Sequence, residues 1–212
     1  MLETISKNKV IIAIGIVWLF HISALIGIAS GALEWFIEKT PFNLMISLLL
    51  FLFIYPINSI GKIIAFALFF FGGMFAEWLG VHYGILFGDY VYGNNLGPKL
   101  DGVPFLIGIY WALLTFITAS ILDYTQLKDI PKILLAAALM VLLDYFMEHN
   151  APVFDFWRFE GGTAPLENYT TWFILALVFQ SVVRVLKIKG NKPFSTHLYL
   201  AQLVFFAFLL YS

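Results

Sequence analysis

The sequence predicts an all-α membrane protein, a polytopic bundle of about seven transmembrane helices. Hydrophobic residues make up 61% of the 212 residues, and the mean hydropathy is +0.91. Only 12% of the residues are charged, whereas a soluble domain carries about 25%. Seven apolar stretches approach the ~20 residues that a spanning helix needs: residues 10–29, 42–57, 61–79, 104–122, 131–148, 169–187 and 196–211.

Residues that break helices bound these stretches. Proline and glycine end helices because proline lacks an N–H and glycine favours turns. The breaks are Thr40-Pro41, Pro56 to Gly61, Gly102 to Pro104, Asp129 to Pro131, and Gly190 to Pro193. The first stretch exceeds the 7–15-residue core typical of a signal peptide, so we expect it to persist as a helix. Residues 1–212 are predicted to form a single integral membrane domain.

Lysine and arginine predict the orientation, because cytoplasmic loops carry an excess of them. With a cytoplasmic N-terminus, nine basic residues lie inside and three outside. The nine are Lys7, Lys9, Lys62, Lys128, Lys132, Arg184, Lys187, Lys189 and Lys192, and the three are Lys39, Lys99 and Arg158. We therefore expect a multi-pass cell-membrane protein in which residues 84–104 and 149–168 share the outer face.

One polar stretch, residues 84–104 (GILFGDYVYGNNLGPKLDGVP), stands out between two apolar runs. Irregular polar backbone is not tolerated against lipid unless protein or water surrounds it. The sequence thus predicts an interfacial or re-entrant Gly/Tyr-rich loop, buried in protein. Its glycines match neither the dinucleotide-binding nor the P-loop spacing.

Three carboxyl groups lie within apolar runs: Glu77, Asp144 and Glu148. A charge at mid-bilayer costs at least ~2.5–3.5 kcal/mol on insertion scales, so such groups usually face the bundle interior and have a function. Asp144 and Glu148 are four residues apart and share a helix face, where two ionised carboxylates repel. Either one keeps a proton or a cation lies between them. A protonated carboxyl is what acid catalysis requires.

Other interpretations of these polar residues remain open. One alternative is that Asp144 and Glu148 lie ionised in an ordinary position at the water interface. A metal site is a second alternative, although no spacing such as H-E-x-x-H supports it; its ligands would be Glu77, His82, Asp144, Glu148 and His149. We therefore predict no metal, and we expect His21 to be a packed core residue.

The composition excludes several classes of function. A net charge of −1 and burial in the membrane argue against binding of nucleic acid. The absence of cysteine excludes disulfides and thiol chemistry.

Aromatic residues, at 18%, gather near the same predicted loops as the acids. Most are expected to pack against lipid or form interfacial belts. Rings around a proton donor also suit a carbocation, because each ring face attracts positive charge by ~0.5–2 kcal/mol. The gathered residues are Trp78, Tyr83, Tyr90, Tyr92, Trp111, Tyr145, Phe154, Phe156, Trp157, Tyr169 and Trp172.

Several segments together resemble a known family. They are EWLGVHYGILFGDYVY (77–92), LGPKLDGVP (96–104), LDYFME (143–148), FDFW (154–157) and PLENY (165–169). In these segments the chain resembles the membrane-integral carotenoid biosynthesis proteins of the carotenoid 1,2-hydratase and bisanhydrobacterioruberin hydratase type. It departs from the family pattern at Gly93-Asn94-Asn95 and at Phe159, which leaves the exact substrate open.

The resemblance implies a cofactor-independent hydro-lyase. It would add water across the terminal C1=C2 double bond of an acyclic (psi) carotenoid end group, giving a tertiary alcohol. The implied partners are the lipid bilayer, water and a carotenoid such as lycopene or gamma-carotene. The site is expected near the outer leaflet.

The resemblance and the residues together suggest roles. The proton donor would be Asp144 or Glu148, and Asp89 and Glu77 are candidates for positioning or deprotonating the attacking water. Glycine lets backbone approach a ligand closely. The expected substrate contacts are Tyr90, Tyr92 and Trp157 around the cation, Asn168 and His82 at the water, and Gly84, Gly88 and Gly97 beside the polyene end.

Three alternatives stay open at the level of sequence. A membrane lycopene cyclase or other terpenoid enzyme would use the same acid chemistry without adding water. A transporter would use the acidic groups as a relay, and a carotenoid-binding subunit would need no catalysis. The carotenoid, the number of ends that react and the oligomeric state are also left open.

Overall fold

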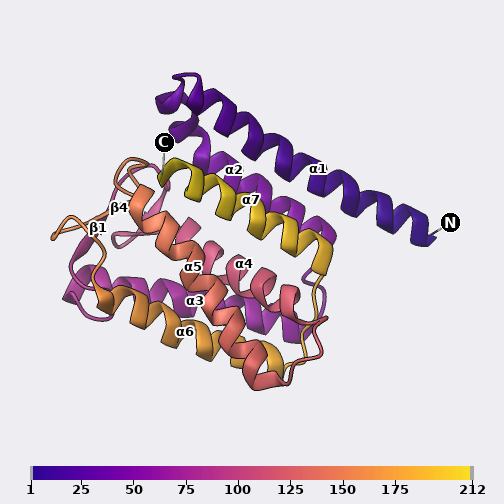
Figure 1. The fold of residues 1–212 in the computed structure, drawn as a ribbon. Helices are drawn as coiled ribbons and strands as arrows, with labels where there is room; N and C mark the ends of the chain where they lie inside the picture. Colours follow the sequence, from indigo (N-terminus) through magenta and orange to yellow (C-terminus); the bar gives the residue numbers. More distant parts are fainter. Residues whose placement is uncertain (1, 211–212) are drawn as a thin grey trace.

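The computed structural model describes residues 2–210 as a bundle of seven α-helices with four short strands (Figure 1). The predicted all-α bundle is confirmed. The helices are α1 (Leu2–Ala29), α2 (Leu33–Ile54), α3 (Ile60–Tyr83), α4 (Phe105–Leu122), α5 (Asp129–Asn150), α6 (Leu166–Val185) and α7 (Lys192–Leu210). The strands are β1 (Tyr90–Tyr92), β2 (Lys99–Leu100), β3 (Val103–Pro104) and β4 (Trp157–Phe159).

Six of the seven helices are long and apolar enough to cross a membrane, judged by length and composition within the described residues. The exception is α6, which has 20 residues but carries Glu167, Asn168, Gln180 and Arg184. Asn168 and Gln180 are buried. The hydropathy of α6 is therefore lowered in part by polar side chains that face other helices.

The start of α2 differs from the prediction. We expected Thr40-Pro41 to precede the helix, but α2 begins at Leu33 and contains Pro41. Proline lacks an N–H, which leaves the carbonyl one turn earlier, at Ile37, without its helical donor. The Asn95 side-chain nitrogen donates to that carbonyl at 2.8 Å and to the Phe154 carbonyl at 2.9 Å. A neighbouring loop thus satisfies the group that proline leaves unpaired.

The helices form three layers around α4 (Figure 1). One layer holds α1, α2 and α7, the opposite layer holds α3 and α6, and α4 and α5 lie between them. Every other helix except α1 packs on α4. The side chains of α4 are accordingly buried along most of its length.

Two loops meet at one end of the bundle, called here the cap end. Strand β1 pairs with β4 in antiparallel register, with Tyr90 opposite Phe159 and Tyr92 opposite Trp157. The predicted common face of the two polar loops, residues 84–104 and 149–168, is confirmed by this pairing. Side chains alternate along a strand, so Tyr90 and Tyr92 point inward while Val91 is exposed.

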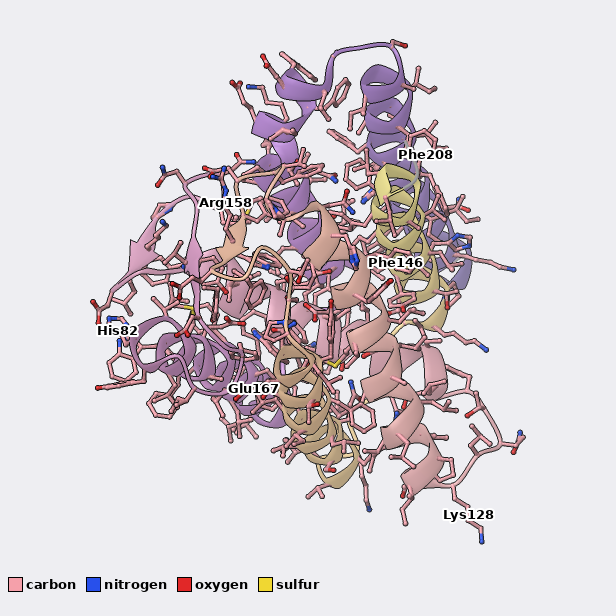
Figure 2. The ribbon with its side chains drawn as sticks, turned by 60° about the vertical axis from the view of Figure 1, so that its left-hand side comes forward. His82, Lys128, Phe146, Arg158, Glu167 and Phe208 are labelled. Carbon is pink, nitrogen blue, oxygen red and sulfur yellow. The ribbon has the colours of Figure 1, made fainter. Side chains whose placement is uncertain are left out.

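The opposite end of the bundle, called here the far end, is closed by an ion pair. Arg184 on α6 donates to the carboxylate of Asp123, which follows α4. Arg184 also donates to the Ala119 carbonyl at 3.2 Å, and Asp123 accepts the Gly190 N–H at 3.3 Å. Lys128 extends from this end (Figure 2).

Candidate active site

Glu77, near the end of α3, is held by three neutral donors. The Tyr90 and Tyr92 hydroxyls donate to Oε2 at 2.5 and 2.7 Å, and the Trp111 indole donates to Oε1 at 2.9 Å. Strand β1 supplies the two tyrosines and α4 supplies the tryptophan. Gly80 gives the Tyr90 ring its space, because a Cβ there would lie 2.8 Å from that ring. Glu77 itself is only 4% exposed.

The two tyrosines remain hydrogen-bond donors at neutral pH. Burial raises the pKa of Tyr90 and of Tyr92 well above the usual phenol value, and the nearby Glu77 carboxylate raises both further. A phenol that keeps its proton is a permanent donor. Both hydroxyls therefore point a proton at the same oxygen of Glu77.

Asp144 and Glu148 lie one turn apart on α5 and both face the interior, at 1% and 8% exposure. The Asn168 amide donates to Glu148 Oε1 at 2.8 Å and to Asp144 Oδ2 at 3.3 Å. The Trp157 indole donates to Glu148 Oε2 at 2.6 Å. The predicted common face of the two carboxyls is present, and neither has the exposed position that the interface alternative required.

The two groups of carboxyls meet at one small cavity of about 10 Å³. That volume corresponds to roughly one water molecule. Asp144 is absent from the lining and lies one helical turn from Glu148 on α5. The residues that line the cavity are Glu77, Tyr90, Tyr92, Ile107, Glu148, Trp157, Phe159, Asn168 and Trp172.

Aromatic rings surround this cavity. Trp111 and Trp172 stack with centroids 3.7 Å apart and planes at 14°. Tyr92 meets Trp157 edge-on at 6.0 Å, and Tyr90 lies 5.3 Å from Phe159. In residues 7–210, whose side chains are described, Glu77, Asp144 and Glu148 form no ion pair. The three carboxyls are thus surrounded by neutral donors and ring faces.

The structure does not bring Asp89 to this cluster. Asp89 immediately precedes the inward-facing Tyr90 and is exposed, because strand geometry turns neighbouring side chains to opposite sides. It lines a surface hollow of about 400 Å³ together with Glu160 and Glu167. Its position does not fit the expected role in positioning the attacking water.

His82 is also outside the cluster, on the outer edge of the bundle (Figure 2). It follows Glu77 by five residues, which places it about 140° away around the helix axis. Its Nε2 lies 3.2 Å from Asp101 Oδ2, and the Trp78 indole donates to the same oxygen at 2.7 Å. The hydrogen bond from Trp78, followed by the influence of His82, lowers the pKa of Asp101. His82 therefore belongs to a surface group and not to a water site.

The three glycines expected beside the polyene serve turns. Gly84, Gly88 and Gly97 have φ of +63°, +89° and +79°, a region that favours glycine. Gly84 ends α3 in the left-handed conformation. Their spacing fits loop geometry, and all three lie outside the lining of the cavity.

Trp111 and Trp172 are the contributors whose roles the sequence did not indicate. Both belong to the aromatic group noted above, but no pattern distinguishes an indole that donates to Glu77 from one that packs against lipid. Across the described residues, no three His, Cys, Asp or Glu side chains converge as they would around a metal. His21 is buried, with Nδ1 2.8 Å from the Val17 carbonyl.

Comparison with known proteins places these observations in a family. Residues 40–211 match the profile of the carotenoid biosynthesis proteins. The chain belongs to this carotenoid biosynthesis protein family. Every residue of the carboxyl cluster lies inside the matched range.

One curated relative is the bisanhydrobacterioruberin hydratase of Haloarcula japonica, which is 27% identical over 106 residues. The match covers 46% of this chain and 36% of the relative. No solved structure matches the chain. Membership of the family places the chain among the carotenoid biosynthesis proteins, and six of its described helices are long and apolar enough to cross a membrane.

Proposed function

We propose that this protein hydrates the terminal C1=C2 double bond of an acyclic carotenoid end group, giving a tertiary alcohol. One observation carries the proposal: Glu77 and Glu148, with Asp144 one helical turn from Glu148, converge on an aromatic-walled cavity with room for about one water. The likeness to the bisanhydrobacterioruberin hydratase of Haloarcula japonica supports a hydration. A hydration needs an acid, a base and one water, and the cluster offers all three positions.

The atoms balance without a cofactor. A carboxylic acid transfers its proton to C2, and the π electrons of C1=C2 form the new C–H bond. Positive charge develops on the more substituted carbon, C1. The water oxygen attacks C1, and its surplus proton passes to a carboxylate. The sum is one alkene and one water converted into one alcohol, with the protein's proton count unchanged.

Glu148 is assigned as the proton donor because it lines the cavity whereas Asp144 does not. Asp144 is a positioning residue. Two carboxylates that share one amide donor repel each other when both are ionised. A single proton held by the pair removes that repulsion and is delivered through Glu148. Asn168 keeps the two carboxyl groups in register.

Glu77 is assigned as the carboxylate. Three donor hydrogens point at its two oxygens, and an acceptor-only group is the form that satisfies all of them. Hydrogen bonds to the charged form favour that form. Glu77 would oppose the cation electrostatically and accept the proton released by the attacking water.

The aromatic rings and the small cavity complete the arrangement. Ring faces attract a cation by ~0.5–2 kcal/mol each when they lie close to it. Excluding bulk water strengthens each electrostatic contact and prevents side reactions. The excess of Lys and Arg on the other side of the predicted topology supports an outer-leaflet position for the site and a cytoplasmic N-terminus.

Expression in a bacterium that accumulates lycopene or a monocyclic precursor, followed by mass spectrometry of the pigments, tests the proposal. We expect a product heavier than its precursor by one water. An isomer of unchanged mass would instead identify a cyclase. Unchanged pigment with either precursor would overturn the enzyme assignment.

A further inference from the structure

Hydration of a double bond consumes one water in each turnover, and the cavity at the carboxyl cluster has room for about one. A new water must therefore enter before each reaction. Eight of the nine residues that line the cavity are buried. The ninth, Phe159 of β4, is partly exposed. Within residues 7–210, whose side chains are described, Phe159 is the lining residue that reaches from the cavity towards solvent.

The surface hollow of about 400 Å³ lies next to Phe159. Among the described residues, Phe159 is the one that lines both the hollow and the cavity. The exposed carboxyls of Asp89, Glu160 and Glu167 line the hollow as well. An ionised carboxylate is costly to remove from water, so the hollow stays hydrated. Because the hollow lies at the surface, its water does not depend on any single one of these carboxyls.

The wall between the hollow and the cavity is thin. Asp89 lines the hollow, and its neighbour Tyr90 lines the cavity. Glu167 and Asn168 divide in the same way at the start of α6. Consecutive Cα atoms are only about 3.8 Å apart. The Glu160 N–H donates to the Asp89 carbonyl at 2.9 Å, which holds the two loops together beside the β1–β4 pair. Water in the hollow is thus separated from the cavity by a single layer of residues.

The Phe159 ring is the part of this wall that can move most easily. Tyr90 and Phe159 are opposite each other in the β1–β4 register, so their side chains lie on the same side of the two strands. Their ring centroids are 5.3 Å apart. The Tyr90 hydroxyl is fixed by its hydrogen bond to Glu77, whereas Phe159 has no polar group to fix it. Side chains that reach solvent change rotamer within picoseconds to nanoseconds.

We propose that Phe159 is the water gate of the site: rotation of its ring admits water from the hollow, and its return closes the cavity again. The inference rests on the proposed function. Closure matters because exclusion of bulk water strengthens the electrostatic contacts inside a site. Phe159 would act through the water that it admits or excludes, and not by contact with the transferred proton.

The absence of cysteine allows this path to be measured directly. Ile107→Cys places a single thiol in the lining of the cavity, where Ile107 is 4% exposed. The protein is held in lipid nanodiscs, which leave both faces in contact with water. The thiol is modified with aminoethyl methanethiosulfonate, a small reagent whose ammonium group favours water and an acidic hollow. Mass spectrometry of the intact protein gives the rate of modification.

Three substitutions are each combined with Ile107→Cys. Phe159→Ala removes the ring, and Phe159→Trp keeps a ring of at least the same size. Val91→Ala is the matched control, because Val91 lies in the paired strand β1 with its side chain exposed. Size-exclusion profiles establish that each variant is folded. Hydrated product per folded protein is measured for the same three substitutions without Ile107→Cys.

We expect Phe159→Ala to accelerate modification by at least about tenfold, since no ring has to move before the reagent passes. Phe159→Trp and Val91→Ala should match the parent protein. Hydrated product should fall in Phe159→Ala and be retained in Phe159→Trp. An unchanged rate in folded Phe159→Ala would overturn the inference. An equal acceleration in Val91→Ala would also overturn it, because the cause would then be a general loosening of the cap end.

Methyl methanethiosulfonate, which is neutral and enters lipid, tests for access from the bilayer. If this reagent modifies Ile107→Cys rapidly and Phe159→Ala changes neither rate, the cavity opens towards lipid and Phe159 is not its gate. Modification requires no substrate, so it tests the gate independently of the proposed function. Failure of that function would appear instead as wild-type cells that yield no hydrated product.

Discussion

The two ends of the bundle bury acidic groups in opposite ways. At the far end, Asp123 is paired with the guanidinium of Arg184, and each side chain also bonds one backbone group, the Gly190 N–H and the Ala119 carbonyl. At the cap end, Glu77, Asp144 and Glu148 are surrounded by hydroxyl, indole and amide donors, with no ion pair among the described side chains. The far end pairs its buried carboxylate with a cation, whereas the three buried carboxyls of the cap end contact only neutral donors.

This difference separates a structural role from a chemical one. A matched pair joins α6 to the loop after α4 and leaves neither charge without a counter-charge. Carboxyls without a cation can exchange protons, because a proton is what relieves their mutual repulsion. Buried ionisable groups without counter-charges are expensive and tend to mark function. The comparison predicts that mutations at the cap end affect chemistry and that mutations at the far end affect stability.

The largest effect is expected for Glu148→Gln. Loss of a general acid lowers the rate by about 10²–10⁴-fold, because the amide accepts contacts but supplies no acidic proton. Product formation per folded protein is the measurement. Glu167→Gln, an exposed acid at the same end, is the control and should be active. Full activity of Glu148→Gln would contradict a chemical role for the buried carboxyls of the cap end.

Asp123→Asn should act on stability instead. Breaking one partner of a buried pair costs about 3–5 kcal/mol, because the other charge is left uncompensated. Unfolding in detergent, followed by circular dichroism, measures the loss. The double variant Asp123→Asn/Arg184→Gln should recover part of it. Reduced product per folded molecule, with unchanged stability, would contradict a structural role.

Tyr92→Phe sharpens the comparison within the cap end. It removes one of the three donors to Glu77, and hydrogen bonds to charged groups contribute about 1.5–3 kcal/mol. We expect a rate reduced by roughly 10–100-fold. Glu77→Gln in the same background should add less than it does alone, because the two residues act together. Additive effects would mean that Tyr92 acts elsewhere.

Asn95→Ala tests the connection between α2 and the cap. It leaves the Ile37 and Phe154 carbonyls without their donor, at a cost of about 1–3 kcal/mol in unfolding free energy. Asn94→Ala, which changes an exposed neighbour, should be neutral. Equal stability of the two variants would show that water replaces the amide.

The smallest effect is expected at the exposed Asp101. In the folded protein the pKa of Asp101 is below the ordinary pKa of an aspartate. The stability that the ionised Asp101 contributes is therefore complete at pH values above the ordinary pKa, and it is lost as the pH falls through the lowered pKa. Release of Trp78 should then change tryptophan fluorescence in acid. Asp101→Asn should abolish this transition, and an unchanged transition in that variant would assign it to another group.

The sequence predicted the features that follow from polar residues standing out against apolar stretches. Glu77, Asp144 and Glu148 were identifiable because they interrupt apolar runs, and the spacing of four residues placed the last two on one face. The common position of the two polar loops followed from the alternation of helices across the membrane. These inferences need only the period of a helix and the cost of a charge in lipid.

The sequence did not predict what depends on three-dimensional direction. Asp89 and Tyr90 are adjacent, and only the β1–β4 pairing determines which of them faces inward. His82 and Glu77 share a helix but not a face. Trp111 lies in an uncharged, largely apolar run, where nothing in the sequence identifies its indole N–H as a donor to Glu77. Pro41 was misplaced because its compensation comes from a residue 54 positions away.

Asn95 donates to the Ile37 carbonyl that Pro41 leaves without a helical donor, and this arrangement has an evolutionary consequence. A donor at position 95 is useful to α2 only while position 41 lacks an N–H, so the two sites should change together among family members. Chains with a non-proline residue at 41 should need the amide at 95 only for the Phe154 carbonyl. Co-variation of this kind, sought between two positions that no local motif connects, would reveal the attachment of the loop in relatives whose coordinates have yet to be determined.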